Sequence, residues 1–296
     1  MSKKQKSAKS SKPSRRPKGP ARRSARGLMS IATSPSKHVK ERVAALEEAP
    51  LAVSYHDENL PEVLRILGDE NEPTKVRLAA LQALQTASFN AVAFAPVRGE
   101  YMATLRKVAK DPDPELRENA LGVLARRKDG FAQKKLLEGL QDPEKALLPP
   151  EKALQLLSYD PHAEAYQAAR EIVRRPPNDD SRREALRLLS ADAKASPMFE
   201  KLLRDKSEPL EIRQLSAAAL HAINPEKLQE HAREIVLDPS EQDDIQAASL
   251  AALTNFGDGE AIANDKALMK RIDRLSSEAP TTVKQSARQF LGKYGQ

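Results

Sequence analysis

Cysteine and tryptophan are both absent from this chain of 296 residues. The lack of cysteine excludes disulfides, thiolate metal sites and a cysteine nucleophile, and it suits a reducing compartment. Aromatic residues make up only 4% of the chain, so its core has to be built from Leu, Ala, Val and Ile. Glycine is scarce as well, with 11 residues, which disfavours an all-β fold with many tight turns.

Long apolar runs are missing too. No stretch of the sequence approaches the roughly 18 consecutive apolar residues that a membrane-spanning helix needs. The N-terminus is basic, but the apolar run that follows it, residues 28–32, is too short for a signal peptide. We therefore expect no membrane span and a cytoplasmic protein.

The net charge of +7 is unevenly distributed along the chain. Residues 1–40 contain 13 Lys and Arg residues and no acid, which leaves 36 basic and 42 acidic residues in the remainder. Residues 1–36 are mostly Lys, Arg, Ser, Pro and Gly, and such a segment cannot bury enough apolar surface to offset its chain entropy. We predict two parts, a disordered basic tail over residues 1–36 and a folded body over residues 37–296.

A nine-residue phrase occurs seven times in the body. Its copies begin at residues 76, 116, 149, 181, 212, 245 and 283, and the copy at 116–124 reads LRENALGVL. Position 9 is Leu in every copy, and position 5 is always Ala or Ser. Positions 1, 5, 8 and 9 share one face of a helix, so the phrase predicts an amphipathic helix. A second amphipathic segment precedes each copy, and a short polar turn, often with proline, separates the two.

Each unit is therefore predicted to be an antiparallel helix pair, and successive copies of the phrase are 31–40 residues apart. One pair cannot bury its apolar face alone, so the pairs must stack on one another. We predict an all-α fold, a right-handed α-solenoid of about seven helix pairs.

The turn with Asp and Pro, the apolar residue followed by Arg, and the closing Ala-Leu and Leu resemble HEAT repeats. The similarity is greatest to the short bacterial type found in bilin-lyase-like HEAT proteins, and it covers roughly residues 38–296. The resemblance implies an armadillo-like helical fold. The functions it implies are diverse, because the family includes scaffolds, transport factors and a few enzymes.

Motifs for catalysis or metal binding are not recognisable in the sequence. The five histidines form no His-Glu dipeptide, whereas a HEAT-like di-iron hydroxylase would need repeated His-Glu pairs. HEAT-like DNA glycosylases use tryptophans, which this chain lacks, and there is neither a Gly-x-Ser-x-Gly nor a Walker A sequence. We expect a non-enzymatic protein without catalytic residues, cofactor, metal or small-molecule substrate. The alternative that the resemblance allows is an accessory lyase or another enzyme with an unrecognised site.

Position 2 of the phrase is basic in five of its seven copies, at Arg77, Arg117, Arg182, Arg213 and Lys284. In a stack of repeats these side chains would form a ladder along one side. Our preferred interpretation is that each pairs with an acid of a turn and ties adjacent repeats together, with candidates Asp111, Asp205 and Asp238. The alternative is a basic ladder that binds an acidic partner.

The longest insertion, residues 85–101, contains three of the few aromatic residues, Phe89, Phe94 and Tyr101. We predict that they pack beneath a loop. The alternative is an exposed docking patch in which Phe94 contacts a partner.

The basic tail carries the strongest functional signal of the sequence. Its cations are Lys3, Lys4, Lys6, Lys9, Lys12, Arg15, Arg16, Lys18, Arg22, Arg23 and Arg26. A flexible cationic arm predicts electrostatic capture of RNA or DNA, with counterion release and a steep dependence on salt. No aromatic residue is interleaved with the charges, so the tail cannot stack on bases. Two alternatives remain, a solubilising or cleavable extension and a tail that folds back on the acidic body under control of serine phosphorylation.

Together these observations predict a scaffold or adaptor that recognises a protein partner. The partner would bind the concave face lined by the second helices of the pairs, and the basic arm would add the capture of a nucleic acid.

Overall fold

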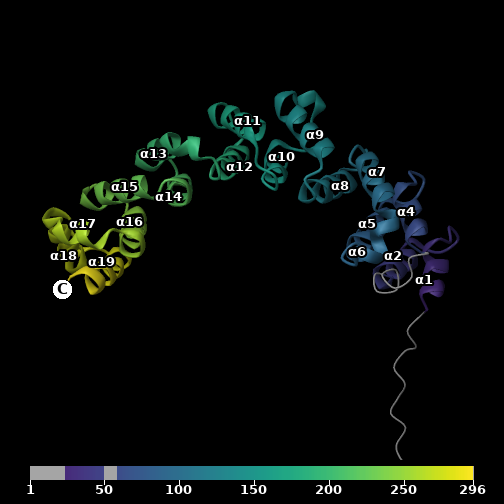
Figure 1. Cartoon of the computed structure of the whole chain (residues 1–296), viewed down its shortest axis with the longest axis horizontal. Coiled ribbons are helices and arrows are strands. Elements are labelled where there is room, and N and C mark those ends of the chain that lie inside the picture. Colours follow the sequence, from purple (N-terminus) through teal and green to yellow (C-terminus); the bar gives the residue numbers. More distant parts are fainter. Residues whose placement is uncertain (1–23, 50–58, 296) are drawn as a thin grey trace, which may run out of the picture. The chain divides into compact units, whose positions relative to one another are not determined.

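The computed structural model describes residues 24–49 and 59–295, and within these ranges every regular element is a helix. The chain divides into two units, Met1–Thr104 and Leu105–Gln296, and the division falls within helix α7. In each unit the helices pack in sequential pairs (Figure 1). None of the helices in the described ranges is both long and apolar enough to cross a membrane.

The N-terminal unit is built from short helices. In chain order these are α1 (Ala25–Ala32), α2 (Val39–Glu48), α4 (Leu60–Gly68), α5 (Thr74–Ala87), α6 (Ala91–Phe94), the 3-10 turn η2 (Ala95–Val97) and α7 (Arg98–Val108). Helix α1 packs on α2, α4 packs on α5, and α2 also packs on α5.

The C-terminal unit continues the same alternation of first and second helices. Its first part contains α8 (Pro114–Arg126), α9 (Gly130–Gln141), η3 (Pro143–Lys145), α10 (Pro150–Leu157), α11 (Ala163–Arg174), α12 (Asp179–Leu189) and η4 (Ala193–Ala195). Its second part contains α13 (Ser196–Arg204), α14 (Leu210–Ile223), α15 (Pro225–Leu237), α16 (Asp243–Phe256), α17 (Gly259–Asn264), α18 (Lys266–Glu278) and α19 (Thr281–Tyr294).

All seven copies of the phrase lie in second helices, namely α5, α8, α10, α12, α14, α16 and α19. The amphipathic segments that precede them lie in α4, α7, α9, α11, α13, α15 and α18. The prediction of an all-α fold of sequential helix pairs is confirmed.

The two invariant positions of the phrase form the seam between helices. Every residue at position 5 is buried, and five of them have no exposed surface, namely Ala80, Ala120, Ala185, Ser216 and Ala287. A small side chain there lets the neighbouring helix approach closely, and the leucine at position 9 fills the space beside it. Leu220, for example, is fully buried at that position. Burial of one such leucine contributes about 1.5–3 kcal/mol.

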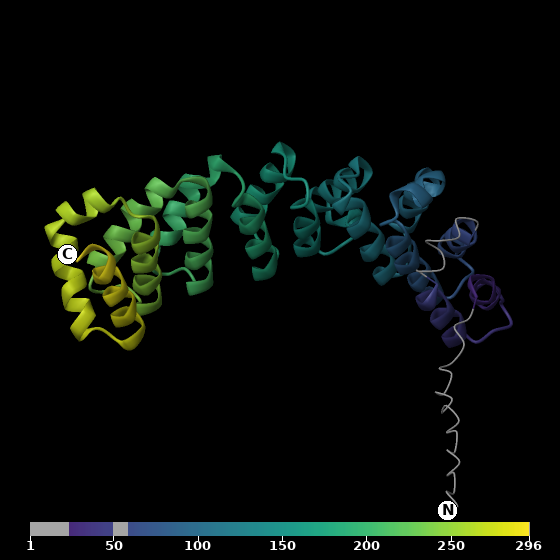
Figure 2. The ribbon, with the colours of Figure 1, turned by 60° about the horizontal axis from the view of Figure 1, so that its bottom comes forward.

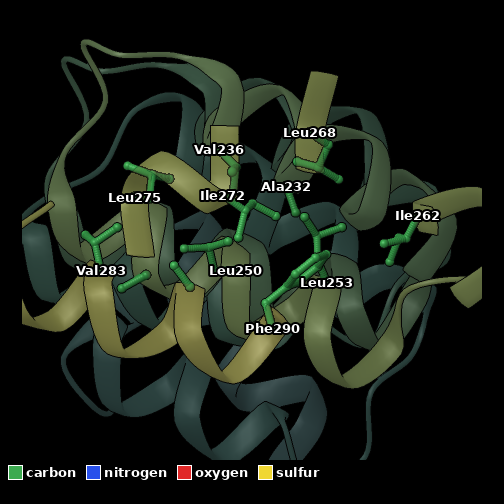
Figure 3. Packing of buried hydrophobic residues seen from close by; sticks show 12 residues of the cluster. Ala232, Val236, Leu250, Leu253, Ile262, Leu268, Ile272, Leu275, Val283 and Phe290 are labelled. Atoms are coloured by element: carbon green, nitrogen blue, oxygen red, sulfur yellow. The ribbon is translucent and has the colours of Figure 1, made fainter. Parts of the chain in front are cut away.

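The last two pairs of the C-terminal unit show this packing (Figure 3). Val236 of α15, Leu250 of α16, Ile272 of α18 and Phe290 of α19 point into one cluster and are all fully buried. Aliphatic side chains make up most of this cluster, as the scarcity of aromatic residues in the sequence predicts.

Asp and Pro residues of the turns mark the N-terminal ends of helices, as in α8. Asp113 caps α8 by accepting hydrogen bonds from the backbone N–H groups of Glu115 and Leu116, both at 3.0 Å. Pro114 occupies the first helical position, where the missing N–H costs nothing. Such caps satisfy donors that the helix itself leaves unpaired and stabilise it by about 1 kcal/mol.

The structure differs from the sequence prediction between residues 24 and 36, where disorder was expected. Helix α1 lies in this segment, and Ser24 is its N-cap. The hydroxyl of Ser24 accepts a hydrogen bond from the N–H of Gly27 at 3.2 Å. Leu28, Met29 and Ala32 are buried, because they give the segment an apolar face that can pack on α2. The average composition of the tail concealed this short amphipathic run.

Helices α1 and α2 therefore form one more pair upstream of the first phrase. Arg42 of α2 takes the place of the basic position 2, and its Nε donates to the carbonyl of Ala32 at 2.8 Å. Arg77 and Arg213 bond in the same way to carbonyls ten residues before them, those of Leu67 and Leu203.

Candidate functional site: a groove between second helices

Helices α14 and α16 lie side by side and run in the same direction. Near their N-terminal ends, Arg213 of α14 binds Glu241, two residues before α16. At their C-terminal ends, the rings of His221 and Phe256 are in contact, with centroids 4.0 Å apart. The view in Figure 2 shows the green helices of this unit side by side.

A groove of about 340 Å³ lies between α14 and α16. Leu203 of α13, Leu228 of α15 and Ile245 of α16 line its deep part, and all three are buried. The shallower part is lined mainly by alanines, which are Ala217, Ala218, Ala248, Ala251 and Ala252. Because alanine has no side chain beyond Cβ, a ligand in this groove can approach close to both helix backbones.

No Asp, Glu, Lys or Arg lines the groove, although 31% of the whole chain is charged. Its polar groups are the side chains of Gln214, Ser249, Asn255 and His221. Gln214 and Asn255 are exposed, and each amide can both donate and accept hydrogen bonds. The groove thus offers apolar contact area with a few neutral polar groups, a combination typical of binding sites.

An aromatic residue closes the C-terminal end of the groove. Phe256 is 48% exposed and is one of two large apolar side chains in the described part of the C-terminal unit with that much exposure, the other being Tyr159. His221 packs against its ring at an interplanar angle of 34°. A partner that covered Phe256 would remove this apolar surface from water.

Acidic side chains flank the N-terminal end of the same groove. Glu211 of α14 lies near this end but faces α12, where it pairs with Arg183, whereas Asp244 lies four residues before Ala248 on α16 and continues the face that lines the groove. Asp243 is adjacent, and all three side chains are exposed. The two ends of the groove therefore differ in charge.

A second hollow, of about 470 Å³, lies between α12 and α14. It shares Gln214 and Ala218 with the groove, and it is lined further by Leu215 and Ala222. These two hollows extend over three successive second helices. Both hollows lie on second helices, where the sequence predicts the partner-binding surface.

The basic residues at position 2 tie adjacent repeats together, and this interpretation is confirmed for two of them. Arg213 binds Glu241 through two hydrogen bonds of 2.7 and 2.6 Å, and its side chain is fully buried. Arg182 binds Glu208 through two hydrogen bonds of 2.8 and 2.6 Å. Their partners are glutamates that precede the next second helix, in place of the aspartates Asp205 and Asp238 that we expected.

Burial determines which of these position-2 residues a partner could reach. Arg77 and Arg213 are 5% and 0% exposed, so neither lies on a surface that a partner can contact. Arg117 donates to the carbonyls of Leu147 and Asp111 at 2.6 and 2.7 Å. Lys284 is half-buried on the last helix, where the described chain has no further repeat to pair with. Arg77, Arg117, Arg182 and Arg213 thus all bond to carbonyls or acids within the chain.

The ion pairs between repeats set the charge states of their members. Burial disfavours the charge of Glu241, but the hydrogen bonds from Arg213 and from the N–H of Gln242 outweigh it and lower its pKa. Hydrogen bonding to Glu208 raises the pKa of Arg182. Two copies have no basic residue at position 2. One of them has Pro150 there, and in the other Gln246 is buried and donates to the carbonyl of Asp238 at 2.7 Å. Gln246 thus supplies a donor to the preceding turn without carrying charge.

The aromatic residues of the insertion at 85–101 separate into two groups. Phe94 and Tyr101 are buried at 1% and 0% exposure, and their rings meet edge to face at 5.2 Å. The prediction of packing is confirmed for this pair, and Phe94 is not available to a partner. Phe89 is the exception, because it is 89% exposed beside Val92 at 86%.

The tail cations Lys3 to Arg23 lie outside the described residues. Arg26 is described, and it is an exposed residue of helix α1.

A buried histidine marks the junction of α13 and α15. His231 places Nε2 at 3.1 Å from Glu200 and Nδ1 at 3.3 Å from Glu234. Burial disfavours the charge of Glu200, but hydrogen bonds from His231 and Ser196 outweigh it and lower its pKa. Both ring nitrogens are engaged, so they are not available as ligands. Among the described residues, no three His, Asp or Glu side chains are placed to hold a metal ion.

The groove itself was not recognised from the sequence, although a signal for it exists. Position 7 of the phrase is an exposed long polar side chain in four copies, at Gln82, Gln155, Arg187 and Gln289. In α14 and α16 this position is Ala218 and Ala251. Two adjacent repeats that lose their long side chains at one surface position leave a hollow there.

No family model and no curated protein matches this sequence. Several solved structures do match, among them one from the complex of CpcE and CpcF of phycocyanin lyase from Nostoc sp. PCC7120. That chain is 16% identical with a TM-score of 0.41, and the match covers 89% of this chain and 97% of that one. Another is human deoxyhypusine hydroxylase in complex with glycerol, at 16% identity and a TM-score of 0.37, covering 83% of this chain and 99% of that one. Neither similarity identifies a ligand or partner of this chain.

Proposed function

We propose that the protein is a non-enzymatic interaction module whose α14–α16 groove binds a segment of a partner protein. The observation that supports this most is the groove's lining, which is free of charged side chains, rich in exposed or half-buried alanine and closed by the half-exposed ring of Phe256. Apolar surface of this kind gains free energy when a partner removes it from water, at about 25 cal/mol per Å². The neutral amides of Gln214 and Asn255 would orient the bound segment.

A peptide display library tests this proposal, because its random sequences sample many possible partner segments at once. The library is selected on the full chain and then counter-selected on Ala218→Arg, which places a long charged side chain in the groove. Ala218 is exposed, so the substitution leaves the core untouched. The matched control is Ala267→Arg, because Ala267 is an exposed alanine of α18 outside the groove.

The proposal expects a family of peptides that bind the wild-type chain and Ala267→Arg but not Ala218→Arg. If selection yields no peptide whose binding depends on Ala218, the groove is not a peptide site and the proposal is wrong.

A second function is proposed for the N-terminal arm, on the strength of its composition alone. The 13 cations and no acids of residues 1–40 favour capture of RNA or DNA. Fluorescence anisotropy of labelled RNA and duplex DNA tests it, comparing the full chain with one that lacks residues 1–23. The deletion stops there because Ser24 caps the folded helix α1.

Neutralisation of six to ten phosphates predicts that affinity falls about 10³–10⁵-fold between 50 and 200 mM salt. Both the affinity and its dependence on salt should disappear with residues 1–23. Equal affinity of the two proteins would assign any nucleic-acid binding to another part of the chain.

A further inference from the structure

The groove between α14 and α16 is asymmetric along its length. Along α16 the lining face reads Asp244, Ala248, Ala252, Phe256 from its N-terminal end. Along α14 it reads Gln214, Ala218, His221, and the acid before them, Glu211, lies on the side that faces α12. Both faces therefore pass from a polar or acidic residue, through alanine, to a ring.

The acids at the N-terminal end carry a surplus of negative charge. Glu211 is paired with Arg183 of α12, whose Nε lies 2.9 Å from its carboxylate. Asp243 and Asp244, in contrast, form no ion pair with any residue that the structure describes. Two exposed carboxylates are thus left without a counter-charge beside an otherwise uncharged groove.

Acids in the first turn of a helix also stabilise that helix, by about 0.3–1 kcal/mol each, through its dipole. This accounts for the presence of acids in the first turn of α16. It does not account for the coincidence of Asp244 with the groove-lining face. A cation of a ligand placed at this end would be attracted by Asp243 and Asp244.

The length of the groove and its alanine lining suit a helix. From Asp244 to Phe256 the face spans twelve residues, which is about 18 Å of helix. The alanines permit a close approach of a third helix, and a helix keeps its own backbone groups hydrogen-bonded in an apolar setting. An extended strand would have to satisfy its backbone with the few neutral polar groups of the groove.

Resting on the proposed function, we infer that the partner segment is an amphipathic helix with an uncharged apolar face and with lysine or arginine in its last turn. A cation is most favourable at the C-terminal end of a helix. The bound helix therefore lies antiparallel to α14 and α16, with its basic end at Asp243 and Asp244. Its first turn then meets the rings of His221 and Phe256.

The experiment is a selection from a library of helical peptides, randomised on one face and in the first and last turns. The library is selected in parallel on the wild-type chain, on the double variant Asp243→Lys/Asp244→Lys and on Glu226→Lys. Glu226 is an exposed acid in the first turn of α15 and lies outside the groove, so its substitution matches the loss of dipole stabilisation. Circular dichroism at 222 nm checks that each variant keeps its helices.

We expect peptides from the wild-type chain and from Glu226→Lys to be enriched in Lys and Arg in the last turn. Peptides from the double variant should be enriched in Asp and Glu there. A wild-type peptide should lose roughly three- to tenfold in affinity on the double variant, as expected for a partly screened charge contact.

Peptides that depend on Ala218 but show no charge preference in the last turn would overturn this inference and leave the proposed function standing. A basic preference in the first turn would overturn the antiparallel orientation. If no selected peptide depends on Ala218, the inference and the proposed function fail together.

Discussion

The pair Arg213–Glu241 should be the most costly ion pair in the C-terminal unit to break. Their side chains are 0% and 2% exposed, and two hydrogen bonds of 2.7 and 2.6 Å join them. Arg213 also donates from Nε to the carbonyl of Leu203 at 2.8 Å. Removing one partner of such a pair leaves a buried charge uncompensated and costs about 3–5 kcal/mol.

The perturbation is a double-mutant cycle with Arg213→Met, Glu241→Met and the double variant. Each single substitution should lower the free energy of unfolding by about 3–5 kcal/mol. The double variant removes both charges and leaves only neutral groups unpaired, such as the carbonyl of Leu203 and the N–H of Gln242. It should therefore cost clearly less than the sum of the two single substitutions.

Urea unfolding of the full chain followed at 222 nm measures these differences. Repeat arrays can unfold region by region, so native-state hydrogen exchange of α14 and α16 should accompany it. The control is Arg174–Glu171, an exposed pair at 2.6 Å whose side chains are 67% and 62% exposed. Glu171→Gln should change stability by less than about 1 kcal/mol. Single substitutions at Arg213 and Glu241 that cost as little as the control, or that add without coupling, would refute the reasoning.

Three further predictions concern the other ion pairs, the packing between helices and a helix cap. Hydrogen bonding to arginine lowers the pKa of Asp265, and it lowers that of Asp129 and Glu241 despite their burial. These ionised carboxylates therefore stabilise the fold at pH values above their ordinary pKa of about 4. The urea midpoint should be constant from pH 7 to about 5 and should fall below about pH 4. A midpoint that rises on acidification would contradict this prediction. Leu220→Ala should cost about 2–5 kcal/mol in the same assay, because Leu220 is fully buried in the seam, and a loss under about 1 kcal/mol would show that the seam is loosely packed. Asp113→Ala should cost about 0.5–2 kcal/mol and increase amide exchange at the start of α8, whereas unchanged exchange at Glu115 and Leu116 would mean that the cap is not formed.

The helix pairs could be predicted from the sequence because their packing depends on spacing alone. Position 5 must be small and position 9 must fill the seam, and a helix brings both to one face. The pair α1–α2 escaped detection for the same reason. Its position 9 is Ala49, and although Ala49 is buried it lacks the leucine by which the other copies are recognised.

For the contacts between repeats, the sequence predicts the types of residue that pair but not the individual partners. That Arg213 pairs with an acid of a following turn is a matter of charge and period. The acid that pairs with Arg213 is determined by the direction of its guanidinium group, which is fixed by the hydrogen bond from Nε to the carbonyl of Leu203. That geometry favours Glu241 over Asp238, and no pattern in the sequence distinguishes the two acids.

The groove is an intermediate case. Its place on second helices follows from the predicted stacking, and Ala218 and Ala251 mark it in the sequence. Its asymmetry arises because α14 and α16 lie side by side with their C-terminal ends at the same level, as the contact between His221 and Phe256 shows. A hollow is a property of two neighbouring repeats, whereas a sequence pattern describes each repeat separately.

The central claim is that the α14–α16 groove is where this protein binds its partner. The most direct test is an anisotropy titration of one selected, labelled peptide against the wild-type chain, Ala218→Arg and Ala267→Arg. The account predicts that the peptide binds the wild-type chain and Ala267→Arg equally and loses at least about tenfold in affinity for Ala218→Arg, or about 1.4 kcal/mol. Equal affinity for all three proteins would contradict it.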